Sequence, residues 1–235
     1  MDSLRHRPFP AFAVLPTLLS LASNFVLYSV PMALCGNLKH VDMTTAFDRA
    51  VPVLPVFTPI YLSFFLVWVL NYILVGYQGQ EAFYRFLCAD LMGRLVCTAF
   101  FVLLPTTNVR PVVENSDVFG RMLNSVVYGN DQATNLFPSV HCFVSWLCFL
   151  GVNAKESPLP RWYKVFLGVY AGLILVATQV LKQHVMADLV AAVALAYGML
   201  ALSRRIGAYR PLQAGCEWLN GKLHIGAGTP RADRE

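Results

Sequence analysis

Residues 135–141 read Asn-Leu-Phe-Pro-Ser-Val-His, and residues 182–188 read Lys-Gln-His-Val-Met-Ala-Asp. Each of these polar stretches opens a long uncharged one, which predicts a polar site at the ends of apolar helices. Ionisable groups at the edge of a membrane are costly and usually mark a functional site. Two histidines, an aspartate and a lysine in these positions indicate phosphate or acyl chemistry at a bilayer surface.

The composition of the chain indicates a membrane protein. Its 235 residues are 57% hydrophobic and only 13% charged, with a mean hydropathy of +0.54, whereas a soluble domain carries about 25% charged residues. We interpret the net charge of +5 as a topology signal with some attraction for anionic lipid, and expect no nucleic-acid partner. The six cysteines form no Cys-x-x-Cys pair, so we predict neither disulfides nor a zinc site.

Six apolar stretches are long enough to be membrane-spanning helices, since a helix crosses about 30 Å of hydrocarbon in about 20 residues. They comprise residues 11–35, 51–77, 88–105, 138–154, 163–181 and 184–203. Arg5 and Arg7 precede the first stretch as in a signal peptide, but no convincing cleavage site follows, so we interpret it as an uncleaved span. We expect residues 81–87 to lie flat at the membrane interface. The predicted fold is an all-α, polytopic bundle of six transmembrane helices.

The bundle defines one membrane domain, residues 1–205, with its candidate motifs in residues 110–188. Residues 206–235 contain several glycines and charged residues, so we expect a loose cytoplasmic tail. With the N-terminus inside, 13 of the 18 basic residues fall on the inner side. Because cytoplasmic loops carry an excess of Lys and Arg, this count favours an N-in/C-in topology. The polar residues of both opening stretches then lie together on the outer face.

His184 and Asp188 are four residues apart, so we expect them on one face of a helix. The aspartate could accept the Nδ1–H of the imidazole and point Nε2 outward as a nucleophile or base. A pair that serves only to solvate a histidine at the membrane edge would show the same spacing, and this alternative stays open.

Pro138 and Ser139 are typical of a helix start, where backbone amides without partners attract anions. His141 follows closely enough to act on a group bound there, although a proline-capped helix with an interfacial histidine is an equal alternative. Arg110 has a fork of donors that matches phosphate oxygens, and Lys182 lies two residues before His184. Either cation alone could simply flank a membrane span.

A metal site is a further alternative, since His141, His184 and Asp188 could provide three ligands. Lys182 and Arg110 would repel a cation there. We therefore expect no metal and no other cofactor.

These residues resemble the motifs of the type 2 phosphatidic acid phosphatase superfamily of membrane lipid phosphatases, which are Lys-x6-Arg-Pro, Pro-Ser-x-His and Ser-Arg-x5-His-x3-Asp. The second motif is intact at residues 138–141, and the third keeps His184 and Asp188. The chain departs from the family where the third motif has Ser-Arg, which is Ala-Thr at residues 177–178 here. The first motif keeps Arg110-Pro111, but Leu103 stands at its lysine position.

The resemblance implies a role for each matching residue. His184 would attack phosphorus and form a phosphohistidine, with Asp188 orienting it. His141 would protonate the leaving lipid oxygen, while Arg110 and Ser139 would bind the phosphate oxygens. We expect Lys182 to compensate for the missing cations, since residue 178 lies about one helical turn, roughly 6 Å, away.

The sequence therefore predicts a metal-independent lipid phosphate or pyrophosphate phosphatase. A basic residue two before the histidine, without the upstream arginine, also resembles the inositol phosphorylceramide synthase branch, which passes a head group to an alcohol. A non-catalytic protein that binds or transports lipid is a third reading. We expect a multi-pass protein of a bacterial plasma membrane, with the active site on its extracytoplasmic face. The oligomeric state, the lipid and the acceptor stay open.

Overall fold

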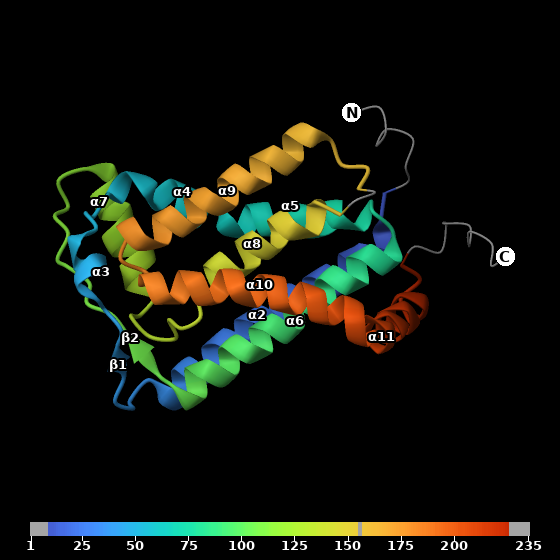
Figure 1. Cartoon of the computed structure of the whole chain (residues 1–235), viewed down its shortest axis with the longest axis horizontal. Coiled ribbons are helices and arrows are strands. Elements are labelled where there is room, and N and C mark those ends of the chain that lie inside the picture. Colours follow the sequence, from blue (N-terminus) through green and yellow to red (C-terminus); the bar gives the residue numbers. More distant parts are fainter. Residues whose placement is uncertain (1–8, 155–156, 226–235) are drawn as a thin grey trace.

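The computed structural model describes residues 9–154 and 157–225 as a bundle of helices with one very short sheet. Its elements are η1 (Ala11–Ala13), α2 (Val14–Cys35), β1 (Val41–Asp42), α3 (Ala46–Ala50), η2 (Pro55–Phe57), α4 (Thr58–Leu62), α5 (Phe64–Gly76), α6 (Gln80–Leu103), β2 (Thr106–Thr107), α7 (Val118–Met122), η3 (Leu123–Tyr128), α8 (Val140–Val152), α9 (Arg161–Val180), α10 (Met186–Ile206) and α11 (Tyr209–Lys222). The strands β1 and β2 pair in parallel. Figure 1 shows α3, α7 and the two strands at one end of the bundle and α11 at the other.

Five helical stretches of the described chain are long and apolar enough to cross a membrane. They are Ala11–Cys35, Pro55–Gly76, Gln80–Leu103, Arg161–Val180 and Met186–Ile206. Their outer faces carry exposed apolar side chains, such as Phe25 at 72% exposure and Leu66 at 71%. A contiguous apolar exterior of this kind fits a lipid environment and would be unusual on a soluble monomer. The prediction of an all-α membrane bundle is confirmed.

The fourth predicted span, residues 138–154, is the shorter helix α8. At 13 residues it is too short to cross a bilayer alone. Instead it packs against α5, α6, α9 and α10. Gly93 of α6 permits this packing, because a Cβ at that position would lie 2.0 Å from Cζ of Phe143 in α8. This central helix brings Ser139 and His141 among the longer helices.

A buried ion pair joins α6 to its neighbours. Arg94 donates through Nε to Asp90 Oδ1 at 2.8 Å, and both side chains are at most 1% exposed. Ser20 donates to Asp90 at 2.7 Å, and Arg94 donates to the Tyr72 hydroxyl at 2.8 Å. Each charge is therefore paired and hydrogen-bonded, which buried charges require. The pair fixes α2 and α5 against α6.

Two sequence predictions about the ends of the bundle are wrong. Residues 81–87 do not lie flat at an interface, because they form the first turns of α6. The tail is not loose over Tyr209–Lys222, which form α11. The Tyr209 hydroxyl donates to Glu81 at 2.9 Å, and the Asn220 amide donates to the Phe12 carbonyl at 3.0 Å. Residues 226–235 of the predicted tail lie outside the described residues.

Candidate active site

The segment between α9 and α10 is a tight turn that positions His184. Lys182 adopts a left-handed backbone conformation, with φ of 51°. The turn folds back so that the amides of Gln183 and His184 both donate to the Thr178 carbonyl, at 2.9 and 3.1 Å. The side-chain amide of Gln179 donates to the His184 carbonyl at 3.0 Å. His184 is buried at 6% exposure and held through both its backbone amide and its carbonyl.

The predicted pairing of His184 with Asp188 occurs, but the two residues do not share a helix. Asp188 lies in the first turn of α10, whereas His184 precedes Val185, the N-cap residue of that helix. Asp188 Oδ2 lies 3.2 Å from His184 Nδ1 and also accepts from the Val185 amide at 3.0 Å. The carboxylate thereby orients the ring through Nδ1 and leaves Nε2 for other chemistry.

Ser139 begins α8 as the sequence predicts. Its side chain accepts from the Cys142 amide at 3.2 Å, and its own amide donates to the Asp188 carbonyl at 3.4 Å. The second bond joins the start of α8 directly to the start of α10. His141 follows in the first turn of α8, with its Nε2 3.1 Å from the Tyr61 hydroxyl. Phe64 packs against the same ring.

The two imidazoles meet at the junction of these helix starts. The ring centroids of His141 and His184 are 5.8 Å apart, although the residues belong to different elements. This separation allows both rings to contact one bound group. The structure therefore brings together His141, His184, Asp188 and Ser139 as one cluster.

Arg110 lies beside this cluster. Its guanidinium donates to the backbone carbonyls of Asp131 and Gln132 and to Gln183 Oε1, the last at 3.2 Å. It also stacks over the Tyr128 ring, 5.0 Å from the centroid. Within the described chain, Arg110 Nε and Gln183 Nε2 are buried without a hydrogen-bond partner. Two donors without protein partners are thus buried next to the turn that carries His184.

Lys182 has protein partners that the sequence did not indicate. Its ammonium donates to the backbone carbonyls of Asp48 and Val51, at the end of α3. Burial lowers the pKa of Lys182, and the charge of Asp48 opposes this effect. Asp48 in turn accepts from the Met186 amide at 2.8 Å. Lys182 and Asp48 therefore clamp α3 onto the turn that contains His184.

The positions of the two missing family cations carry no substitute. Leu103, at the lysine position of the first motif, is 82% exposed on the apolar exterior. Thr178, at the arginine position of the third motif, is fully buried; its hydroxyl donates to the Leu175 carbonyl and contacts the Cys142 thiol. A long cationic side chain at position 178 would be fully buried, so we expect any compensating charge to come from elsewhere.

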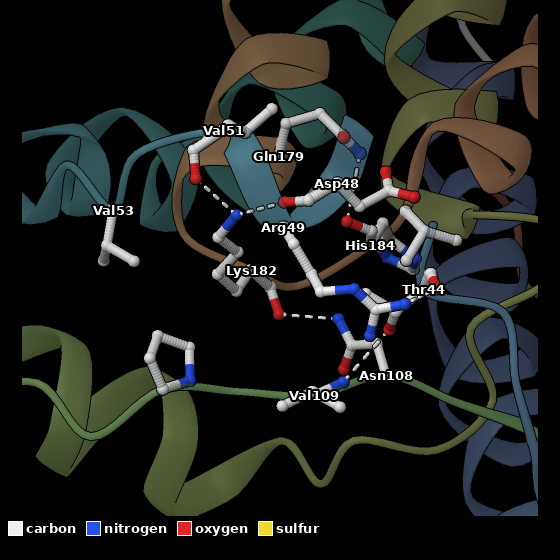
Figure 2. Close-up of a pocket in the computed structure, with 12 residues that line it drawn as sticks. Thr44, Asp48, Arg49, Val51, Val53, Asn108, Val109, Gln179, Lys182 and His184 are labelled. Carbon is white, nitrogen blue, oxygen red and sulfur yellow. Dashed lines mark hydrogen bonds between the residues drawn. The ribbon is translucent and has the colours of Figure 1, made fainter. Parts of the chain in front are cut away.

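Two cavities adjoin the histidine pair, one beside each ring. The first, which we call the polar cavity, has a volume of about 350 Å³; polar and charged residues, among them Arg49, Asn108, Lys182 and His184, line it together with several valines. Figure 2 shows the Arg49 side chain projecting into this cavity. The second has a volume of about 560 Å³, includes His141, and is lined mainly by apolar and aromatic side chains from α2, α4, α5 and η3. The two rings thus stand between a polar and an apolar compartment.

Comparison with protein families agrees with this arrangement. A model of the PAP2 superfamily matches residues 27–202, about three quarters of the chain. The chain belongs to the PAP2 superfamily. Searches of curated proteins and of solved structures found no match. The matched range includes both histidines and the segment that carries Arg49, so membership supports a phosphatase-type fold and, in general terms, phosphoester hydrolysis.

Sequence reasoning missed several residues that surround the site. Tyr61 contacts His141, Gln183 binds Arg110, and Asn108 donates to the Lys182 carbonyl at 2.9 Å. None of these belongs to a family motif. In the sequence, only the position of Gln183 within the polar stretch 182–188 indicated a role at the site. For Tyr61 the sequence showed no more than a hydroxyl-bearing side chain within an apolar span.

Proposed function

We propose that the protein is a metal-independent lipid phosphate or pyrophosphate phosphatase that acts through a phosphohistidine. The observation that supports this most strongly is the pair of imidazoles, one from the first turn of α8 and one from the turn between α9 and α10, 5.8 Å apart, with His184 bound through Nδ1 to a buried carboxylate. Covalent phosphoryl transfer requires a nucleophile, here His184 oriented by the Asp188 carboxylate, next to a second group that transfers protons, here His141.

In the first step, His184 Nε2 attacks phosphorus and the bond between phosphorus and the lipid oxygen breaks. His141 donates a proton to that oxygen, so the lipid leaves as an alcohol from a lipid phosphate and as a lipid monophosphate from a lipid pyrophosphate. In the second step, a water attacks the phosphohistidine while His141 accepts its proton, and the P–N bond breaks to release inorganic phosphate. Asp188 stabilises the positive charge that the His184 ring carries between the two steps.

The phosphate oxygens would bind to Arg110, Ser139 and Lys182. Arg110 Nε and the neighbouring Gln183 Nε2 are donors without protein partners in the described chain. Ser139 uses its oxygen to accept from Cys142, which leaves its hydroxyl proton for a ligand. Lys182 contributes its charge from the wall of the polar cavity. Fixed donors of this kind stabilise the charge that develops on a transferring phosphoryl group.

The apolar cavity beside His141 would take the lipid chain. Phe25 and Phe65 line it and are also exposed on the apolar exterior, at 72% and 52%. A chain could therefore enter sideways from the bilayer, with its phosphate between the two histidines. This places the leaving lipid oxygen on the His141 side, where its proton donor lies.

A head-group phosphotransferase of the inositol phosphorylceramide synthase type is the alternative, and one observation favours it. The polar cavity beside His184, about 350 Å³, lies within the size range of ligand pockets, about 300–1,000 Å³, and a phosphoryl group alone would not fill it. Asn108 Oδ1, one of its buried polar atoms, has no partner among the described residues and could accept from a polyol hydroxyl.

The membrane location follows from the same proposal. The site would face the extracytoplasmic side of a bacterial plasma membrane, with the lipid phosphate as its substrate. A non-catalytic lipid-binding or transport protein is the second alternative, because two family cations are missing.

Product analysis separates the three readings. Purified full-length protein would be incubated with phosphatidate, phosphatidylglycerol phosphate and a polyprenyl diphosphate, with and without polyol acceptors. We expect release of inorganic phosphate, inhibition by orthovanadate, no effect of chelators, and loss of activity in His184→Ala. Head-group transfer without phosphate release would support the phosphotransferase. An inactive wild-type protein, together with normal cellular function of His184→Ala, would support the non-catalytic reading.

A further inference from the structure

We propose that Arg49, which belongs to no family motif, is a phosphate-binding residue of this site. This inference rests on the proposed function, and it assigns the cation that compensates for the two missing ones. Arg49 lies in α3 and precedes the first motif, which begins at Leu103, by 54 residues in the sequence. Only the fold brings Arg49 next to residues 181–185, the turn that carries His184, which we call the catalytic turn.

Arg49 lines the same polar cavity as His184 and Lys182. In Figure 2 its guanidinium extends from α3 into the cavity, on the side lined by Asn108 and Thr44. Among the described residues, the Arg49 guanidinium makes a single hydrogen bond, from Nη2 to the Thr44 carbonyl at 3.1 Å. Among the described residues, the three ion pairs do not include Arg49. Most of its donors therefore remain available to an anion beside His184.

The attachment of α3 explains why Arg49 is held there. Asp48, its neighbour, is 5% exposed and accepts from the Met186 amide at the start of α10. Asp48 and Thr45 form a capping box that begins α3. The Lys182 ammonium binds the carbonyls of Asp48 and Val51 from the other side. A five-residue helix would not be stable alone, so these contacts with the catalytic turn position it.

The same contacts assign different tasks to the two cations. Two carbonyls occupy the Lys182 ammonium, which makes this residue an anchor for α3 as well as a source of charge. Arg49 has a planar fork of donors that can bind two phosphate oxygens at once, which an ammonium cannot do. Arg49 is also exposed, so a soluble anion or a lipid phosphate can reach it. From the sequence we expect Lys182 alone to compensate for the two missing family cations. On this proposal, Lys182 and Arg49 share that role.

Binding of inorganic phosphate and orthovanadate to the purified full-length protein tests this assignment without requiring turnover. A ligand that binds the folded state raises the melting temperature by mass action, so titration gives an affinity for each variant. The variants are Arg49→Gln, Arg49→Lys and, as a matched control, Arg121→Gln, an exposed arginine on α7 that lines neither cavity. The kinetic constants kcat and KM for a lipid phosphate are measured on the same preparations.

We expect Arg49→Gln to weaken phosphate and vanadate binding about 10-fold or more and to lower kcat/KM by about 10- to 100-fold. Arg49→Lys should be intermediate, and Arg121→Gln should match the wild type. Affinities in Arg49→Gln equal to those of the wild type would overturn the assignment, whatever the lipid activity. If the wild type binds phosphate through Arg49 but hydrolyses no lipid phosphate, the proposed function fails and this inference stands. If Arg49→Gln does not fold, the Arg49→Lys variant tests the assignment instead. A phosphate affinity of Arg49→Lys equal to that of the wild type would reject the contact of the Arg49 guanidinium with two phosphate oxygens.

Discussion

The role of Asp188 can be tested by Asp188→Asn, which removes the charge while keeping the shape of the side chain. The carboxylate accepts from the Val185 amide and lies 3.2 Å from His184 Nδ1. An asparagine oxygen can still accept at this position, so the loop should keep its conformation. Asp188→Ala would instead leave a buried amide without a partner, at a cost of about 1–3 kcal/mol. The asparagine variant therefore isolates the electrostatic contribution.

The expected size of the effect follows from the distance. Phosphorylation places positive charge on the His184 ring, and unit charges about 4 Å apart interact by about 4 kcal/mol at an effective dielectric constant near 20. The retained hydrogen bond offsets part of this, which leaves a loss of about 2–4 kcal/mol. Such a loss lowers kcat roughly 30- to 1,000-fold. KM should change little, because Asp188 is fully buried and contacts Nδ1 of the ring, whereas Nε2 is the atom that would bind phosphorus.

The assay is steady-state phosphate release from a short-chain lipid phosphate in detergent, with kcat and KM determined separately. Glu114→Gln is the matched control, since this carboxylate is exposed in the segment before α7 and lines neither cavity. Melting temperatures would show that both variants are folded. A kcat within threefold of the wild type in a folded Asp188→Asn protein would refute the electrostatic role, and a selective rise in KM would place Asp188 in substrate binding.

Two further predictions concern Asp48, which attaches α3 to the turn that carries His184, and the buried ion pair of Asp90 and Arg94. Burial raises the pKa of Asp48, but hydrogen bonds and a nearby lysine outweigh it, so the pKa lies below its usual value. Asp48→Asn should lower the melting temperature near pH 7, and the difference from the wild type should shrink as the pH falls from about 4 through the folded pKa; a difference independent of pH would contradict this. Asp90→Asn should destabilise the protein by about 3–5 kcal/mol, because Arg94 stays buried without its counter-charge. The partly exposed pair of Arg85 and Glu81 is the control, since Arg85→Gln should cost under about 1 kcal/mol. Equal losses of stability on thermal unfolding would argue against a large contribution from the buried pair of Asp90 and Arg94.

The sequence was sufficient for the features that depend on local chemistry. Apolar length identified the spans that became α2, α6, α9 and α10, with ends within a few residues except at α6. The Pro-Ser pattern located the start of α8, since a serine that caps a helix acts within its own turn. The spacing of His184 and Asp188 indicated their contact, but the expectation that they share a helix face was wrong. The left-handed turn at Lys182, and not a shared helix face, brings them together.

The features that the sequence could not supply depend on contacts between distant segments. Arg49 reaches the site because Asp48 and Lys182 attach α3 to the catalytic turn, and neither contact has a sequence signature. Tyr61 lies 80 residues from His141, which it contacts. The helix α11 was missed because its glycines and charges resemble those of a loose tail, whereas tertiary packing against α6 stabilises it.

Identification of the residue that carries the phosphoryl group gives the most direct test of the proposed role of His184. Purified protein would be mixed with a lipid carrying a ³²P-labelled phosphate, quenched in alkali because phosphohistidine is labile in acid, and mapped by peptide sequencing. The account predicts transient label on His184, with none in His184→Asn. Label on His141 or on any other residue, or turnover by a folded His184→Asn protein, would contradict it.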